Sequence, residues 1–386
     1  MSRRHGILLP IIAVTAALLS ACAQPAKPGD PLPGLTTEQR ELFERGRQVV
    51  EREFTPETGL GPLFNSPSCG ECHEDPVAGG GGDEVEVHVA VLRADGSCDP
   101  LVERGGPVIQ QFVTPLLHSA LGIDREPVPA EATVQAGRKT PDLFGFGLLD
   151  AIQDSTILSY ADPDDRDHDG ISGRPNRFFD GRLGRFGRKA LVPTLREFND
   201  GALVVEQGVT NPAVPTEESI GGDLIPPGVD PAPEPEIDQQ GIDAVDAFIR
   251  FLAPPAPAKL SYEGRRGRSL FSKIGCAACH VPTLITGESR IKALSRKKVA
   301  AYTDLLLHDM GPELADICLG LASPSEFRTE PLMGLRLSHS FLHDGRATTI
   351  EQALLLHSGE ASASRDRFKS LSASDRTALL RFLNSL

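Results

Sequence analysis

The sequence predicts a mainly α-helical protein made of two similar modules. The motif Cys-x-x-Cys-His occurs twice, at residues 69–73 and 276–280. A stretch with the periodicity of an amphipathic helix precedes each copy, at residues 37–53 and 262–274, and both stretches contain Arg-Gly-Arg. A length of 386 residues is also sufficient for two domains.

The N-terminus has the pattern of a bacterial secretory signal. A short basic region precedes an apolar run over residues 7–19, which is too short to span a bilayer with ease. The run closes on Leu-Ser-Ala-Cys, which resembles the lipobox of bacterial lipoproteins and ends at Cys22. We expect residues 1–22 to be a lipoprotein signal peptide, with an ordinary signal peptide as the alternative. Residues 23–35, rich in Pro, predict a tether.

This N-terminus predicts a location at the bacterial cell envelope, on the periplasmic face. The lipid on Cys22 would be the only contact with the membrane, because no later run is long and apolar enough for a transmembrane helix.

The first module should extend over residues 36–254. It begins with helix 37–53, whose first residues, Thr-Thr-Glu-Gln, can cap the N-terminus. Alternating valines over residues 84–92 predict a short strand. The module is longer than a minimal one, so we expect large inserted loops with short strands.

The second module should extend over residues 255–386. A proline-rich stretch at residues 254–257 marks the boundary. The module opens with helix 262–274 and closes with an apolar helix over residues 377–383.

Cys-x-x-Cys-His has a specific chemistry. Two thiols at this spacing reach the vinyl groups of one porphyrin, and the adjacent His then lies under the iron. A redox dithiol or half of a zinc site would not explain the His after both pairs. We therefore expect two covalent haems c in two cytochrome c modules. The attachment residues would be Cys69, Cys72, Cys276 and Cys279, and the proximal ligands His73 and His280.

Two cysteines remain, Cys98 and Cys318. An oxidising compartment favours a disulfide, and two buried thiols are the alternative, because sequence does not measure their separation. The net charge of −14 argues against nucleic acid as a partner. It suits a basic electron-transfer partner, although solubility alone explains it as well.

An aspartate-rich stretch resembles a calcium loop. Asp165, Asp167 and Asp169 alternate before a glycine, as at the start of an EF-hand, but the twelfth position is Asn176 instead of Glu. Carboxylates this close repel each other unless a cation joins them or water solvates them. Ca²⁺ and a solvated acidic turn are therefore the two alternatives.

Several longer stretches are similar to one protein family. Residues 341–353, Phe-Leu-His-Asp-Gly-Arg-Ala-Thr-Thr-Ile-Glu-Gln-Ala, resemble the closing motif of bacterial di-haem cytochrome c peroxidases. Other stretches resemble the related di-haem oxidoreductase family, also labelled thiol oxidoreductase; they lie at residues 140–152, 162–176, 183–190 and 302–311.

The resemblance implies two cytochrome c modules that face each other. One haem would act on substrate, a small oxidant such as peroxide. The other would relay electrons from a small donor protein or a quinone-linked donor.

The resemblance also implies axial ligands. In the peroxidases a Met follows the Thr-x-Glu-Gln-Ala helix start, and His357 occupies that position here. A core His bonded to backbone is the alternative, and Met310 and Met333 are rival ligands. For the first iron, His88 and His118 are both candidates and neither is preferred.

The distal acid of the peroxidases, a Glu with a nearby Gln, has no match in this chain. Asp150 replaces the Glu of the family's Gly-Leu-Leu-Glu-Ala-Ile stretch and is the candidate catalytic acid; helix capping or a haem-pocket role are the alternatives. Arg188 stands where the family tends to carry a Trp, so electron hopping through that Trp is not available.

Two functions therefore compete. The first is a peroxidase-like oxidoreductase with electron relay from the C-terminal to the N-terminal haem. The second is a non-enzymatic di-haem electron carrier with both irons six-coordinate. A thiol oxidoreductase gains no support, because haem uses both Cys-x-x-Cys pairs.

Overall fold

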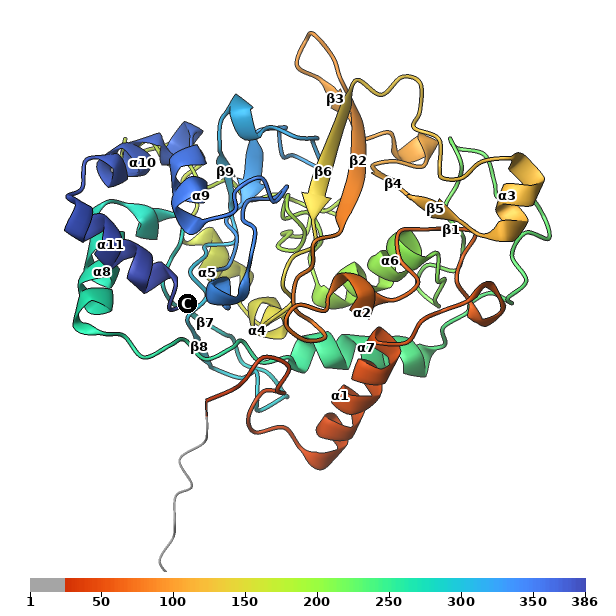
Figure 1. Cartoon of the computed structure of the whole chain (residues 1–386), viewed down its shortest axis with the longest axis horizontal. Coiled ribbons are helices and arrows are strands. Elements are labelled where there is room, and N and C mark those ends of the chain that lie inside the picture. Colours follow the sequence, from red (N-terminus) through yellow and green to blue (C-terminus); the bar gives the residue numbers. More distant parts are fainter. Residues whose placement is uncertain (1–24) are drawn as a thin grey trace, which may run out of the picture.

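The structure is a computed structural model that describes residues 25–386 (Figure 1). The predicted signal peptide, the anchor at Cys22 and the first residues of the predicted tether lie outside the described residues. Within residues 25–386, no helix has the length and apolar character needed to cross a membrane.

The described chain is mainly helical and carries four small antiparallel sheets. The α-helices are α1 (Thr37–Val50), α2 (Cys69–Cys72), α3 (Pro115–Leu121), α4 (Phe146–Asp150), α5 (Asp154–Leu158), α6 (Leu195–Gln207), α7 (Gln239–Phe251), α8 (Tyr262–Lys273), α9 (Ile350–Leu356), α10 (Ser362–Lys369) and α11 (Ala373–Leu383). The strands are β1 (Leu63–Phe64), β2 (Val85–Leu92), β3 (Cys98–Asp99), β4 (Val108–Ile109), β5 (Phe112–Val113), β6 (Val134–Lys139), β7 (Leu284–Ile285), β8 (Lys298–Val299), β9 (Leu307–Asp309) and β10 (Glu326–Arg328). These elements confirm the predicted helices and the predicted valine strand.

The first long helix packs on α7. Thr36 and Gln39 form the expected capping box at the start of α1. Phe43 of α1 contacts Phe248 of α7, with ring centroids 5.1 Å apart. The helices cross so closely at Gly46 that an added methyl group would lie 1.9 Å from the carbonyl oxygen of Ala244.

The pair α8 and α11 repeats this arrangement (Figure 1, left). Phe271 of α8 contacts Phe382 of α11, with ring centroids 5.5 Å apart. A methyl group added at Gly267 would lie 1.9 Å from the carbonyl oxygen of Ala378. Each Arg-Gly-Arg sequence therefore supplies the glycine at which one helix meets the backbone of its partner.

We expect Gly267→Ala to lower the free energy of unfolding by about 3 kcal/mol, because the new methyl group cannot coexist with the Ala378 carbonyl unless the helices separate. Gly201→Ala is the matched control: Gly201 lies inside α6 with open space around its Cα. It should be neutral or stabilise by up to about 1 kcal/mol. Urea unfolding of both variants measures the difference, and equal effects would contradict the close crossing.

The described part of the predicted tether, within residues 23–35, packs against the end of α7. Leu32 is buried, and its backbone N–H donates to the carbonyl of Phe251 at 2.7 Å. The N–H of Ala253 donates to the carbonyl of Asp30 at 2.9 Å. Backbone pairing and burial of Leu32 and Leu35 attach this segment to the end of α7.

The largest hydrophobic core does not divide at the predicted boundary between residues 254 and 255. It combines side chains of α1, α4, α6 and α7 with apolar residues between 281 and 306. A second core lies among the C-terminal helices around Phe271, Phe368 and Phe382. The two halves of the chain therefore share one buried interior.

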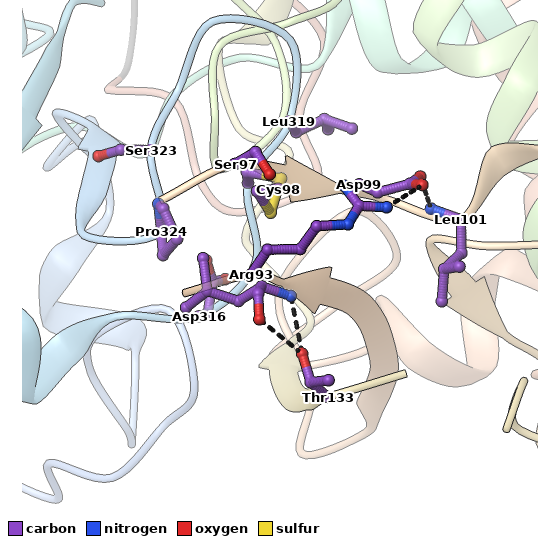
Figure 2. Close-up of a disulfide and its surroundings, with 12 residues drawn as sticks. Arg93, Ser97, Cys98, Asp99, Leu101, Thr133, Asp316, Leu319, Ser323 and Pro324 are labelled. Atoms are coloured by element: carbon purple, nitrogen blue, oxygen red, sulfur yellow. Dashed lines mark hydrogen bonds and ion pairs between the residues drawn. A yellow bond between two sulfur atoms is a disulfide. The ribbon is translucent and has the colours of Figure 1, made fainter. Parts of the chain in front are cut away.

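A disulfide joins Cys98 on β3 to Cys318, across 220 positions of sequence (Figure 2). Next to it, the buried carboxylate of Asp316 pairs with Arg138 of β6 at 2.7 Å and with Lys189 at 2.7 Å. Of the two alternatives for these cysteines, the structure has the disulfide. Together with the ion pairs, it fixes the β2 sheet to the C-terminal half.

Candidate functional site

The second Cys-x-x-Cys-His motif follows α8 and begins with the 3₁₀-helix Cys276–Ala278. Its Cys276, Cys279 and His280 line a cavity of about 270 Å³. The walls of this cavity are largely apolar and come from both halves of the chain, with Phe144, Phe146, Phe271, Phe341, Ile350, Leu354, Phe368 and Leu383 among them.

His280 and His357 line the same cavity, and their rings have the same tautomer and the same kind of hydrogen bond. The Nδ1–H of His280 donates to the carbonyl of Tyr302 at 2.9 Å, and that of His357 donates to the carbonyl of Ala353 at 2.7 Å. Each bond fixes one tautomer and leaves Nε2 without a proton. Burial lowers the pKa of both rings, that of His280 to about 4, so both imidazoles are neutral and able to bind a metal.

The first motif begins at α2, where Ser68 caps the helix with its hydroxyl. The Nδ1–H of His73 donates to the carbonyl of Gly80 at 3.0 Å, which again leaves Nε2 free. Burial lowers the pKa of His73 as well. The predicted proximal ligands of both motifs therefore have the same hydrogen-bond arrangement.

Burial raises the pKa of Cys69, Cys72 and Cys276 to about 12, which does not favour a reactive thiolate. All four motif cysteines are free, while Cys98 and Cys318 are paired. Neutral thiols, a neutral His with a free Nε2 and apolar walls are what a covalently attached haem requires, so the residues fit that group.

Other candidates for the second iron lie near the same cavity. Met310 and Met333 line it together with His357, so the structure brings all three predicted ligands to one place. His308 also lines the cavity, but both ring nitrogens have acidic partners, with Nε2 2.8 Å from Asp304 and Nδ1 2.7 Å from Glu360. His343 also lines the cavity and stacks on Phe327, with centroids 4.3 Å apart.

Among the described residues, each of the two histidines proposed for the first iron keeps one ring nitrogen without a partner, Nδ1 in His88 and Nε2 in His118. His88 is buried on β2, with Nε2 2.9 Å from a carboxylate oxygen of Glu86. His118 is exposed, and its Nδ1 donates to the carbonyl of Ile123 at 2.9 Å. The sixth ligand of the first iron stays unassigned.

Asp150 has the contacts of a helix cap. One carboxylate oxygen accepts the backbone N–H of Leu195 at 2.9 Å, at the start of α6, and the other pairs with Arg250 at 2.5 Å. Asp150 lines a second, more open cavity beside Arg185 and is not among the residues around the first cavity. These contacts fit the capping alternative, and the catalytic role of Asp150 stays an untested prediction.

Arg188 lies in the wall of the first cavity. Its guanidinium pairs with Glu330 at 3.0 Å and donates to the carbonyl of Lys139 at 2.9 Å. Arg188, which stands where the di-haem oxidoreductase family tends to carry a Trp, is thus a cationic side chain held between segments of both halves of the chain.

The aspartate loop brings three carboxylates together. Oxygen atoms of Asp165, Asp167 and Asp169 lie within 4.8 Å of one another. Asp165 accepts the N–H of Gly170 at 3.2 Å, which closes the turn. Asn176 is fully buried and its amide donates to two backbone carbonyls, so it does not supply the twelfth-position ligand of an EF-hand.

Sequence reasoning missed a pair of acids near the first motif. Burial and the charge of Glu86 raise the pKa of Glu206 well above its usual range, and Glu206 in turn raises the pKa of Cys69 and Cys72. Glu86 and His88 lie two positions apart on β2 and therefore on the same face of the strand. Two polar residues on one face of a valine-rich strand were the sequence signal for a buried polar group.

The helix pairs, the paired Cys-x-x-Cys-His motifs and the imidazoles with free Nε2 atoms define a haem-binding oxidoreductase. Residues 130–386 match the family described as "Di-haem oxidoreductase, putative peroxidase". The match covers more than half of the chain, and the chain belongs to this family. No curated protein is matched by the sequence.

Solved structures show only distant likeness. The chain is 16% identical to the diheme peroxidase BthA from Burkholderia thailandensis, over 90% of this chain and 86% of that chain, with a TM-score of 0.42. A MauG-like protein associated with microbial copper homeostasis shares 15% identity over 94% and 92%, with a TM-score of 0.39. Hydrazine synthase of Kuenenia stuttgartiensis shares 14% over 99% and 100%, with a TM-score of 0.40. Likeness at this level says nothing about activity.

Proposed function

We propose that this protein is a di-haem c oxidoreductase of the peroxidase type on the periplasmic side of the cell envelope. When bound, the C-terminal haem would relay electrons to the N-terminal haem. The N-terminal haem would reduce a small oxidant such as peroxide. Cys69, Cys72, Cys276 and Cys279 would hold the two haems covalently, and His73 and His280 would be the proximal ligands.

The hydrogen bonds of the three histidines carry this proposal. In His73, His280 and His357, Nδ1–H donates to a backbone carbonyl, which orients the ring and directs the free Nε2 to a metal. Two of these rings share the cavity of the second motif, which favours a six-coordinate C-terminal haem suited to electron relay. Only one is associated with the first motif, where His88 uses Nε2 for Glu86 and His118 is exposed. A first iron without a second protein ligand would favour the enzyme.

The two modules are part of the proposal. The pairs α1/α7 and α8/α11 both cross at a glycine and both have a Phe–Phe contact. In each pair one helix precedes a Cys-x-x-Cys-His motif in the sequence and the other helix follows it. We infer one cytochrome c module per pair, with the β2 sheet as an insertion in the first. Residues between 281 and 306 would then belong to the core of the first module as well.

Optical and EPR spectra of the mature protein, produced with haem c maturation, test the function. We expect a pyridine haemochrome of two haems per chain. In the half-reduced protein, we expect one high-spin ferric signal that disappears when peroxide is added, with turnover when a reduced donor is supplied. Two low-spin haems that ignore peroxide in every redox state would make the chain an electron carrier, a role that Arg188 in place of the family's Trp would suit.

Replacing the proposed sixth ligand should change the potential of the C-terminal haem. We expect His357→Met to raise it by roughly 0.1 V or more, because axial ligands set haem potentials over about 0.8 V and Met favours the ferrous state. Redox titration followed by absorbance measures this. Met333→Leu is the matched control and should leave the potential unchanged. A shift in the control alone would assign the ligand to Met333.

We also propose that Asp165, Asp167 and Asp169 bind Ca²⁺. Asp167→Asn should bind one Ca²⁺ ion fewer per chain than the parent. Added Ca²⁺ should also raise the melting temperature of this variant less than that of the parent. Asp164→Asn, an exposed aspartate in the same loop and outside the cluster, is the control. If both variants retain the response, the loop is a solvated acidic turn.

A further inference from the structure

A second group of acids lies outside the two motifs, in the long connection between α6 and α7. Residues 208–238 contain no helix or strand, only one isolated bridge between Ile220 and Asp223. A connection of this length inside a compact body is generally ordered by something other than its own backbone. Four of its side chains converge: Glu217, Asp230, Glu234 and Glu236.

The four carboxylates are close enough to share one ion. One oxygen atom of each lies within 4.8 Å of the corresponding oxygen of every other. Two oxygens on opposite sides of a Ca²⁺ ion lie about 4.6–5.2 Å apart, because each Ca–O distance is about 2.3–2.6 Å. The spacing therefore matches a single coordination sphere.

Glu234 is exposed and the other three side chains are half-buried, yet three of their oxygens are shielded and lack partners. Oε1 of Glu217, Oδ2 of Asp230 and Oε1 of Glu236 are shielded from solvent and have no hydrogen-bond donor. Among the described residues, no Lys, Arg or His forms an ion pair with any of the four. Buried polar atoms are almost always satisfied, so three such atoms at one point indicate a missing partner.

The nearby donors do not satisfy the group: the backbone N–H of Ala232 donates to Oδ1 of Asp230 at 2.9 Å, and the other donors belong to Thr210. The hydroxyl of the fully buried Thr210 contacts both Glu234 and Glu236, yet a hydroxyl carries a single proton. The backbone N–H of Thr210 donates to Oε2 of Glu236 at 2.7 Å. Thr210 therefore positions the two acids without neutralising them.

We propose that Glu217, Asp230, Glu234 and Glu236 bind one divalent cation, Ca²⁺ by their all-oxygen chemistry, and that this ion orders the connection between α6 and α7. The site is separate from the aspartate loop and from both haem motifs. Without a cation, burial and the charges of Glu236, Glu234 and Asp230 raise the pKa of Glu217 to about 10. Protons would then occupy the place of the ion.

Ca²⁺ counting on the EDTA-treated holoprotein tests the proposal. Equilibrium dialysis against Ca²⁺, with metal analysis, should show one ion fewer in Glu217→Gln and in Asp230→Asn than in the parent chain. Asp223→Asn is the matched control, since it removes an exposed charge from the same connection but lies outside the group. The same measurements are repeated in the Asp167→Asn background, so that Ca²⁺ bound by this group is counted separately from Ca²⁺ bound by the aspartate loop.

Thermal melting gives a second readout. In EDTA, Glu217→Gln should melt close to the parent, because Glu217 already carries a proton when no cation is bound. In Ca²⁺ the parent should gain stability and the variant should not. An unchanged Ca²⁺ count in both Glu217→Gln and Asp230→Asn would overturn the proposal. So would a parent chain that binds no Ca²⁺ in the Asp167→Asn background, which would mean that the group holds protons only.

Discussion

Replacing Cys276 and Cys279 together by serine should reduce the haem content from two to one per chain and reduce peroxide turnover to the background of free haem. The hydroxyls cannot form thioethers, and the cavity would hold its haem only through His280 and His357. Since the C-terminal half would relay electrons to the first haem, its loss should stop multiple turnovers even with the first motif intact. Pyridine haemochrome analysis after denaturation measures the covalent haem.

The matched substitution at the other pair separates haem attachment from general damage. Cys98→Ser with Cys318→Ser also removes two sulfurs but should retain two haems, because neither residue lines the cavity. Two covalent haems in the Cys276/Cys279 variant, or one in the Cys98/Cys318 variant, would contradict the assignment of the motifs.

Loss of the Cys98–Cys318 disulfide should lower stability by about 3–5 kcal/mol, or roughly 10 °C in melting temperature. The bond closes a loop of 220 residues in sequence, so its removal releases a large conformational freedom in the unfolded chain. Calorimetry of the double serine variant measures the effect. The wild-type protein in reductant should melt near the variant.

Reductant supplies the internal control for this prediction. It should lower the melting temperature of the wild type and leave that of the double variant unchanged, since the four motif sulfurs are expected to be in thioethers. A wild type that is insensitive to reductant while its haems are intact would show that the disulfide contributes nothing to stability.

The parts of the fold that sequence predicted are those with local causes. The capping residues of α1 and the apolar periodicity of α8 act within one or two turns, so both helices were placed correctly. The histidine that follows each Cys-x-x-Cys pair is likewise a local signal. The assignment of His357 depended on a family motif, and the structure places it opposite His280 in one cavity.

Features that depend on distant partners were not predictable in this way. Asp150 is held by Arg250, one hundred positions later, which no pattern around Asp150 indicates. The pairing of Cys98 with Cys318 depends on a separation in space that sequence does not contain. The acids between α6 and α7 have irregular spacing, and only folding of the connection brings them together.

If the chain is exported and carries haem c as proposed, the disulfide would also constrain the order of events during biogenesis. In a chain exported from its N-terminus, Cys69, Cys72 and Cys98 emerge together, whereas Cys318 follows 220 residues after Cys98. Until then the nearest thiols available to Cys98 are those of the first haem motif, and oxidation would join the wrong pair. Haem attachment at Cys69 and Cys72 must therefore precede the arrival of Cys318, or a disulfide isomerase must correct the error. Cells with a weak haem-ligation system should accordingly accumulate misoxidised chains rather than merely haem-free ones.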